Sequence, residues 1–348
     1  MSKRNLTLLD APAPSPTINN QFVCCCFNMK VVIFAAIALL LPALSIQYSY
    51  ASISNNDNDN ATSETYQFIS KWGIKGSGAA QFSEHNDVIV VDNSTVFVPD
   101  YENHRIQKFT TDGEYVTEWG TKGTEDGNFN KPHSMGSDSE GNVYVTDMNN
   151  HRIQKFTSDG QFITKWGSEG TGDSQFLHPH GLDVDSEGNV YVTDAELLNI
   201  QKFTKDGQFL TSWGGIAGTG PSEFSWLESV DVDSQGNVYV ADMKNHRIQK
   251  FNSNGDFISM WGSKGIGDGQ FNNPAGVAVD SLDNIYITDQ DNGRIQKFTS
   301  DGKFITKWGS AGNGDSQFAE PEGIDVDSSG RIYIADTSNN RIQVFQLQ

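Results

Sequence analysis

The sequence is poor in cysteine and in basic residues. Its 348 residues include three cysteines, which are the consecutive Cys24, Cys25 and Cys26, and 24 Lys and Arg against 44 Asp and Glu, for a net charge of −20. A chain with so few cations does not favour binding to a phosphate backbone, so we expect no nucleic-acid partner. Without cysteine beyond position 26, the rest of the chain can form neither disulfides nor thiolate metal sites. The excess of carboxylates instead favours solubility and the attraction of cations.

Long hydrophobic runs are also absent, with one exception near the N-terminus. The run VVIFAAIALLLPALSI, which starts at Val31, is apolar for 16 residues. It is shorter than the roughly 20 residues of a membrane-spanning helix and has the length of the apolar region of a secretory signal peptide. We predict that Met29 is the true start and that signal peptidase cleaves after Ala51, so that residues 1–51 are an extension and a signal peptide. The mature protein is then secreted or attached to the cell surface.

A second interpretation of the N-terminus keeps the hydrophobic segment. If the segment is not cleaved, it anchors the protein to the membrane beside palmitoylated cysteines. Membrane association is expected only through this uncleaved segment. Residues 52–65, SISNNDNDNATSET, are polar and without periodicity, and they are predicted to form a flexible linker.

The remainder of the chain, residues 66–348, is a tandem repeat. A Trp-Gly pair recurs every 47 or 48 residues, which gives six units. Each unit predicts four short strands with period-two alternation, such as HGLDVD, NVYVTD, NIQKFT and QFLTSW in the third unit. Six four-stranded antiparallel units predict an all-β fold, a six-bladed β-propeller. The repeated tryptophans are Trp72, Trp119, Trp166, Trp213, Trp261 and Trp308.

The two ends of the repeat array complement each other. The last copy stops at RIQVFQLQ and lacks its fourth strand, whereas an orphan strand, YQFISKWG, stands at residues 66–73 ahead of the first complete copy. We predict that the orphan strand pairs as the outer strand of the last blade. This pairing would close the ring and remove an exposed edge.

The repeat itself resembles a known family. FNNPAGVAVDSLDNIYITDQDNGRIQKFTSDGKFITKWG is similar to the consensus NHL repeat, and the resemblance covers residues 66–348. It implies a six-bladed propeller, but it does not imply one function, because such propellers serve as binding, sensor and lyase domains. We predict a monomeric binding, sensor or scaffold module that takes a protein or small-molecule ligand on one face of the propeller.

The alternative is an enzyme, a metal-dependent lyase. The pattern resembles that of peptidyl-hydroxyglycine amidating and antibiotic lyases, and in the amidating family a histidine that follows proline in the inner strand ligates zinc. His133 in FNKPHSMGSD and His180 in HPHGLDVD match that position. The chain departs from this family because its two histidines lie on adjacent rather than alternate blades. The family's Arg after the blade aspartate is Met148 or Ala195 here, and only Tyr101 could correspond to its Tyr.

Recurrent polar residues are predicted to be structural. The Arg of NHRIQ recurs in five units, and we expect each to pair with the aspartate of its own blade rather than to form five active sites. The third unit has Asn199 in place of Arg, with Leu197 and Leu198 expected to be exposed at a turn. This deviation indicates either a contact with a partner or a local repacking. The Asp-rich DSEGN turns lack the spacing of calcium loops and are interpreted as turn chemistry.

One variable position is a candidate metal site. Aligning the six copies on the first Phe of each inner strand places one residue per blade at the mouth of the central channel. We predict that His133, His180, Glu228 and Glu322 could hold a divalent metal such as Zn²⁺ or Ca²⁺, with alternate blades contributing His133, Glu228 and Glu322. The other interpretation is that the position merely faces water in the channel. His85 and His178 are not expected to line the channel, and no catalytic residue can be named. The six aligned residues are Asn86, His133, His180, Glu228, Ala275 and Glu322.

Overall fold

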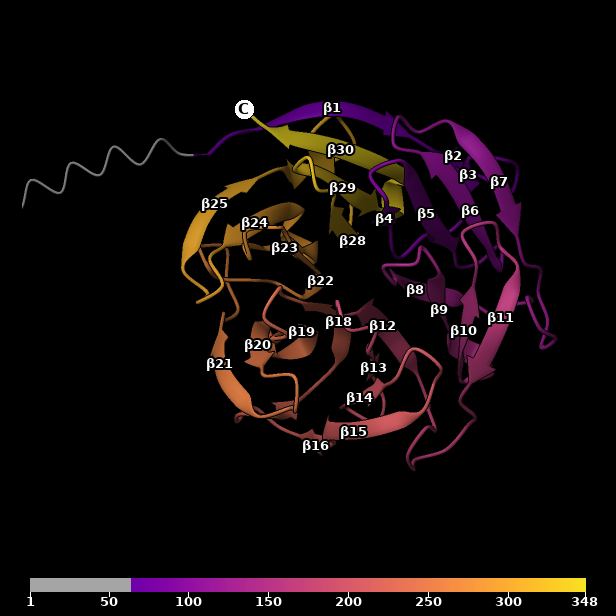
Figure 1. The fold of residues 1–348 in the computed structure, drawn as a ribbon. Coiled ribbons are helices and arrows are strands. Elements are labelled where there is room, and N and C mark those ends of the chain that lie inside the picture. The colour runs from indigo at the N-terminus through magenta and orange to yellow at the C-terminus, as the bar shows by residue number, and fades with distance from the viewer. Residues whose placement is uncertain (1–63) are drawn as a thin grey trace, which may run out of the picture. The chain divides into compact units, whose positions relative to one another are not determined.

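The computed structural model describes residues 64–348. The predicted signal peptide, the three cysteines and nearly all of the predicted linker lie outside these residues. Within them, no helix is long and apolar enough to cross a membrane. The described part of the chain is a ring of six four-stranded antiparallel sheets around a central channel, as Figure 1 shows. The all-β, six-bladed prediction is therefore confirmed.

Each blade runs from an innermost strand at the channel to an outermost strand at the rim, and neighbouring strands pair antiparallel. The short strands alternate apolar and polar residues, and Asn, Asp and Gly at positive φ make the hairpin turns between them. The first three blades consist of β4 (Ile89–Val91), β5 (Thr95–Asp100), β6 (Arg105–Thr110) and β7 (Tyr115–Trp119); β8 (Pro132–Ser137), β9 (Val143–Asp147), β10 (Arg152–Phe156) and β11 (Phe162–Trp166); and β12 (Pro179–Val184), β13 (Val190–Asp194), β14 (Asn199–Phe203) and β15 (Phe209–Gly214).

The remaining three blades follow the same order, except that the last one takes its outer strand from the start of the described chain. They consist of β18 (Leu227–Val232), β19 (Val238–Asp242), β20 (Arg247–Phe251) and β21 (Phe257–Trp261); β22 (Pro274–Val279), β23 (Ile285–Asp289), β24 (Arg294–Phe298) and β25 (Phe304–Trp308); and β28 (Pro321–Val326), β29 (Arg331–Asp336), β30 (Arg341–Leu347) and β1 (Tyr66–Trp72).

Short elements join the blades. Parallel two-stranded pairs lie in three of the crossing loops, and single 3₁₀ turns follow the second strand in four blades. The pairs are β2 (Ile74–Lys75) with β3 (Gln81–Phe82), β16 (Ile216–Ala217) with β17 (Glu223–Phe224), and β26 (Ser310–Ala311) with β27 (Gln317–Phe318); the turns are η1 (Met148–Asn150), η2 (Met243–Asn245), η3 (Gln290–Asn292) and η4 (Thr337–Asn339).

The ring closes as predicted, because β1 pairs with β30 in register from Tyr66 opposite Leu347 to Trp72 opposite Ile342. The seam between the fifth and sixth blades differs from the other five. At those five, a hairpin glycine packs on the tryptophan of the preceding blade, and a Cβ on Gly113 would lie 2.6 Å from the Trp72 ring. At the seam between the fifth and sixth blades there is no such glycine, because β30 and β1 are not joined by a hairpin, and the Tyr66 ring stacks on Trp308 with centroids 4.1 Å apart. This aromatic contact takes the place of the hairpin glycine.

The hydrophobic core lies between blades. One representative cluster joins Tyr191 and Ile200 of the third blade to Phe224, Val238 and Phe251 of the fourth, all fully buried. Each blade therefore buries its faces only against its neighbours, as expected for a repeat protein. The stability of the disc is shared among six such interfaces.

The predicted pairing of blade arginines and aspartates is confirmed. Asp242 is 0 % exposed, and its Oδ2 accepts hydrogen bonds from Arg247 Nε at 2.7 Å and Gln249 Nε2 at 3.2 Å. Arg247 also donates to backbone carbonyls of the loop that enters the blade, so the pair fastens this loop to the sheet. The five pairs are Asp100–Arg105, Asp147–Arg152, Asp242–Arg247, Asp289–Arg294 and Asp336–Arg341.

The third blade compensates locally for its missing arginine. Asp194 is fully buried and accepts hydrogen bonds from the backbone N–H groups of Leu177, His178 and Leu197 instead. Leu198 packs against the core cluster between the third and fourth blades. The expected exposure of this turn is therefore wrong, and of the two interpretations the structure favours local repacking.

Candidate metal centre at the channel mouth

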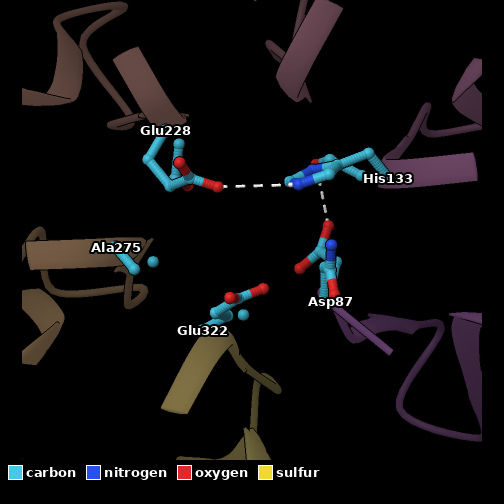
Figure 2. Close-up of a pocket in the computed structure, with 10 residues that line it drawn as sticks. Asp87, His133, Glu228, Ala275 and Glu322 are labelled. Atoms are coloured by element: carbon cyan, nitrogen blue, oxygen red, sulfur yellow. Dashed lines mark hydrogen bonds and ion pairs between the residues drawn. The ribbon is translucent and has the colours of Figure 1, made fainter. Parts of the chain in front are cut away.

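The six residues that the sequence alignment places at one position of each blade, here called the slot residues, all lie at one end of the channel. His133, His180, Glu228, Ala275 and Glu322 are each the second residue of an innermost strand, while Asn86 precedes β4. Each of these five strands shows a register shift directly after its first residue, for example between Pro179 and Leu182. Such an irregularity frees the slot residue from the ladder and re-aims its side chain. In Figure 2 the labelled side chains of this ring converge on the channel.

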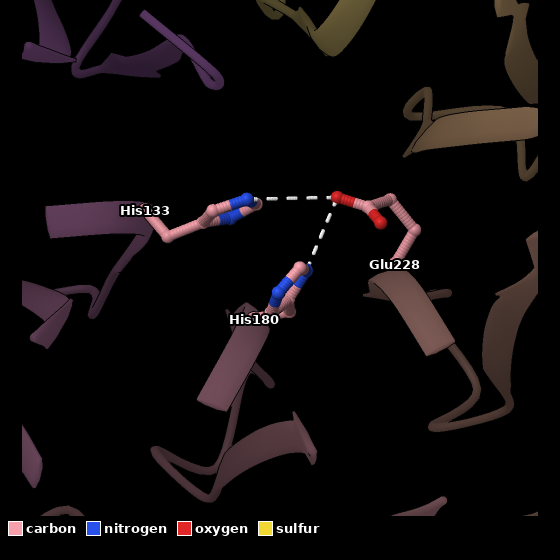
Figure 3. Close-up of side chains that lie close together, drawn as sticks. All are labelled: His133, His180 and Glu228. Carbon is pink, nitrogen blue, oxygen red and sulfur yellow. Dashed lines mark hydrogen bonds and ion pairs between the residues drawn. The ribbon is translucent and has the colours of Figure 1, made fainter. Parts of the chain in front are cut away.

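Three of the four candidate ligands come together. The ligand atoms of His133, His180 and Glu228 lie within 4.8 Å of one another, as Figure 3 shows. His180 Nδ1 is 3.2 Å from Glu228 Oε1, and His133 Nε2 is 3.6 Å from the same oxygen. We call these three residues the mouth cluster.

The spacing of the mouth cluster suits a tetrahedral metal ion. Ligand atoms about 2.1 Å from a tetrahedral zinc ion lie roughly 3.4 Å from one another. The two histidine–carboxylate separations, 3.2 and 3.6 Å, bracket that value, and all three ligand atoms lie within 4.8 Å of one another. An ion could therefore be accepted between these atoms with little rearrangement of the backbone.

Burial sets the protonation of the cluster. His133, His180 and Glu228 are 8 %, 5 % and 9 % exposed. Burial and the neighbouring His180 lower the pKa of His133 to about 3, so its imidazole is neutral and keeps a lone pair for a metal at pH 7. Burial opposes ionisation of Glu228, but the two histidines hold the pKa of this carboxyl below its usual range. The cluster therefore offers two imidazoles and one carboxylate.

Two further side chains orient the cluster. His178 Nδ1 lies 3.0 Å from His180 Nε2, and Trp226 Nε1 donates to Glu228 Oε2 at 2.8 Å. Metal-binding histidines commonly donate their second ring N–H to a neighbouring acceptor, which fixes the ring and its tautomer. His178 was not expected to line the channel, and it lines neither of the two cavities found there; it contacts the cluster through His180. Its spacing of two residues from His180 is the signal in the sequence, because residues two apart in an extended segment share a face.

The expected choice of alternate blades does not match the structure. The clustered residues come from the adjacent second, third and fourth blades, and Glu322 of the sixth blade is not among them. Its carboxylate points into the same mouth from the opposite side (Figure 2). Neighbouring inner strands lie closest together near the axis, which explains why adjacent blades meet first.

A group of carboxylates lies deeper in the channel, which the sequence analysis did not single out. Asp87, Asp183, Asp231 and Asp325, here called the channel carboxylates, line a cavity of about 170 Å³. All four accept a backbone N–H from the next blade, as Asp325 does from Val90 at 2.6 Å. Burial raises the pKa of Asp87 to about 6 and that of Asp325 to about 7. Among residues 64–348, no Lys or Arg lines this cavity.

Sequence comparison identifies the repeat. The NHL repeat model matches residues 129–156, 176–203, 224–251, 271–298 and 318–345. The chain is an NHL-repeat propeller. The comparison with curated proteins finds no match to this NHL chain.

Solved structures share the fold of this NHL propeller at low identity. A protein of unknown function from Bacteroides thetaiotaomicron is 20 % identical with a TM-score of 0.64, covering 82 % of this chain and 76 % of that one. An auxiliary nutrient binding protein from the same organism is 16 % identical with a TM-score of 0.57, covering 83 % and 74 %. A catalytically inactive virginiamycin B lyase from Staphylococcus aureus, solved with quinupristin, is 17 % identical with a TM-score of 0.55, covering 82 % and 89 %. At such identities these similarities establish the fold alone.

Proposed function

We propose that the protein is an exported NHL-repeat propeller that binds a small-molecule or protein ligand at the channel mouth through a divalent metal ion. The observation that carries this proposal is the convergence of His133, His180 and Glu228 on one point at metal-ligand spacing. Burying two imidazoles and a carboxylate costs free energy, and among residues 64–348 no Lys or Arg lines the cavity beside them. A bound metal offsets that cost.

The donor set selects the kind of metal. Two imidazoles and one carboxylate suit Zn²⁺ or Fe²⁺, whereas Ca²⁺ takes oxygen ligands only. Three protein ligands leave at least one coordination position for an external group, as in metal sites that act on ligands rather than stabilise a fold. His178 and Trp226 would hold His180 and Glu228 in place while that group is exchanged.

A metal-dependent lyase is the second candidate. The observation that favours it is again the open coordination position, together with a fold shared with an antibiotic lyase. Against it, Met148 and Ala195 occupy positions where the amidating lyases carry arginine. Turnover of peptidyl-hydroxyglycine or streptogramin substrates by the zinc-loaded protein would favour this candidate over the binding module.

Metal analysis tests the proposal directly. The purified protein should hold about one zinc or iron ion per chain, measured by inductively coupled plasma mass spectrometry after equilibration with both metals. His180→Ala and Glu228→Gln should each lose most of this metal, since three ligands cannot be reduced to two without a large drop in affinity. His246→Ala, a histidine away from the channel, is the matched control and should keep it. If neither the parent protein nor the control variant holds stoichiometric metal, the proposed metal centre is refuted.

Export has its own test. We propose that secretion depends on residues 29–51, because they have the composition of a complete signal peptide. N-terminal sequencing of protein from the culture medium or the cell surface should find a start near Ser52. A start at Met1, or a retained hydrophobic segment, would contradict cleavage.

A further inference from the structure

The channel mouth has two unlike halves. The second, third and fourth blades contribute the mouth cluster, whereas the fifth and sixth contribute Ala275 and Glu322 across the channel (Figure 2). Both halves line one small cavity of about 20 Å³, whose walls include Glu228 and Asp87. That volume accommodates a single group of the size of a water molecule.

Glu322 is held in place but only half satisfied. Its Oε1 accepts a hydrogen bond from Gln290 Nε2 at 3.0 Å. Its Oε2 is buried and has no hydrogen-bond partner among the described residues. Buried polar atoms are nearly always paired, and each exception calls for an explanation.

The charges that face Glu322 are all negative. Burial first of all, and then the carboxylates of Glu228, Glu320, Glu84 and Asp87, raise the pKa of its carboxyl group well above the usual range, and among residues 64–348 no Lys or Arg lines the cavity. Glu84 and Glu320 are exposed at the rim beside it. This half of the mouth therefore attracts a cation but contains none of its own.

We propose that Glu322 receives the primary ammonium group of the ligand that binds at the mouth cluster, an inference that rests on the proposed metal-centred function. The ligand class is then a small amine that carries a metal-coordinating group at its other end. An ammonium group is close to water in size and carries three donors, one of which would satisfy Glu322 Oε2. A guanidinium or a quaternary ammonium group is too large for the cavity.

Matched zinc ligands test this inference. Two series of short-chain alkyl hydroxamates, which chelate zinc, are titrated into the zinc-loaded protein by calorimetry. One series ends in a primary ammonium and the other in a methyl group of similar size. For the best chain length, the ammonium probe should bind roughly tenfold more tightly, since a charge-assisted hydrogen bond is gained. A trimethylammonium probe should gain nothing.

Two variants locate the effect. Glu322→Gln should abolish the ammonium preference and leave binding of the methyl series unchanged, whereas Glu125→Gln, an exposed carboxylate on a crossing loop, should keep the preference. Melting followed by circular dichroism should show that Glu322→Gln folds, because it removes a buried charge without altering shape.

The outcomes separate the two proposals. Equal binding of both series to the parent protein, or an unchanged preference in Glu322→Gln, would overturn the ammonium site while leaving the metal centre intact. Failure of both series to bind the zinc-loaded protein would overturn the metal-centred function, and the ammonium site with it.

Discussion

Two sets of aspartates in this protein, one fully buried in the blades and one half-buried along the channel, obey opposite rules. In the blades, Asp242 and its four equivalents are 0 % exposed, and each faces an arginine of its own blade. In the channel, Asp231 faces Asp183 and Asp325, and its carboxyl group is hydrogen-bonded to backbone N–H groups and to the side chain of Asp183, with no Lys or Arg lining the cavity among residues 64–348. The blade charges are neutralised by the fold, whereas the channel charges are not.

The comparison separates scaffold from site. A buried carboxylate that is paired and fully hydrogen-bonded fastens the structure, and it recurs in blade after blade. Removing a carboxylate from water without a neighbouring cation raises its pKa. Keeping such a group ionised at neutral pH lowers the free energy of unfolding. The protein concentrates the second kind around one axis, where six blades meet. That axis is where we place its function.

Breaking a blade pair should produce the largest effect. Asp242→Asn keeps the shape but leaves Arg247 buried without its counter-charge, so we expect a loss of about 3–5 kcal/mol in the free energy of unfolding. Chemical denaturation measures this loss. Asp206→Asn, at an exposed turn, should change stability by less than about 0.5 kcal/mol. Equal stability of the two variants would show that the blade pairs do not hold the loops.

The channel should make stability depend on pH in the opposite direction from that of a typical carboxylate. The pKa values of Asp87 and Asp325 rise on folding from about 4 to about 6 and about 7. The folded state therefore binds more protons between pH 4 and pH 7, and its free energy of unfolding falls as the pH rises through this window. Each unit of pKa corresponds to about 1.4 kcal/mol. Denaturation of metal-free protein at pH 5 and pH 7.5 should show a decrease on the order of 3–4 kcal/mol; a flat or rising profile would count against channel carboxylates without a counter-charge.

Removing one channel charge should give the smallest effect, with a gain in stability. Asp231 has a pKa raised by burial and by Asp183, so one proton is shared between the two carboxyl groups. Asp183→Asn replaces that proton with an amide N–H donor and should stabilise the protein at pH 7.5 by about 1 kcal/mol. Scanning calorimetry would detect this as an increase of roughly 2 °C in Tm. A lower Tm would mean that Asp183 is ionised in the folded protein and that its charge is neutralised by a partner, as the charges of the blade aspartates are.

Much of the fold was predictable because it is repeated. The Trp-Gly period, the alternating strands and the orphan strand at residues 66–73 each indicated a closed six-bladed ring, and the structure confirms it. The Arg of NHRIQ was assigned to its blade aspartate for the same reason. Because the pattern occurs six times, a strand that is ambiguous in one copy can be assigned from the equivalent residues of the others.

The site was predictable only in part because it lies where the copies differ. Alignment found the slot of His133, His180 and Glu228, but it could not tell which blades approach one another at the axis. Which of these side chains meet at the axis depends on the length and rotamer of each one. Asp87 was missed for a related reason: the first blade reaches the channel with a different residue of its inner segment than the third, fourth and sixth do.

The closure of the ring has a consequence for how the protein is made. Strand β1 is the first of the described strands to be synthesised, and its partner β30 is the last; Thr65 and Gln348, beside their outer ends, are 283 positions apart in the sequence. Until β30 appears, Tyr66 has only Trp308 to stack on and β1 has an unpaired edge on both sides. Contacts of such long range are slow to form and leave strands open to aggregation. The closing step therefore follows the synthesis of β30, and β1 must be kept from pairing with other chains for the whole of that time.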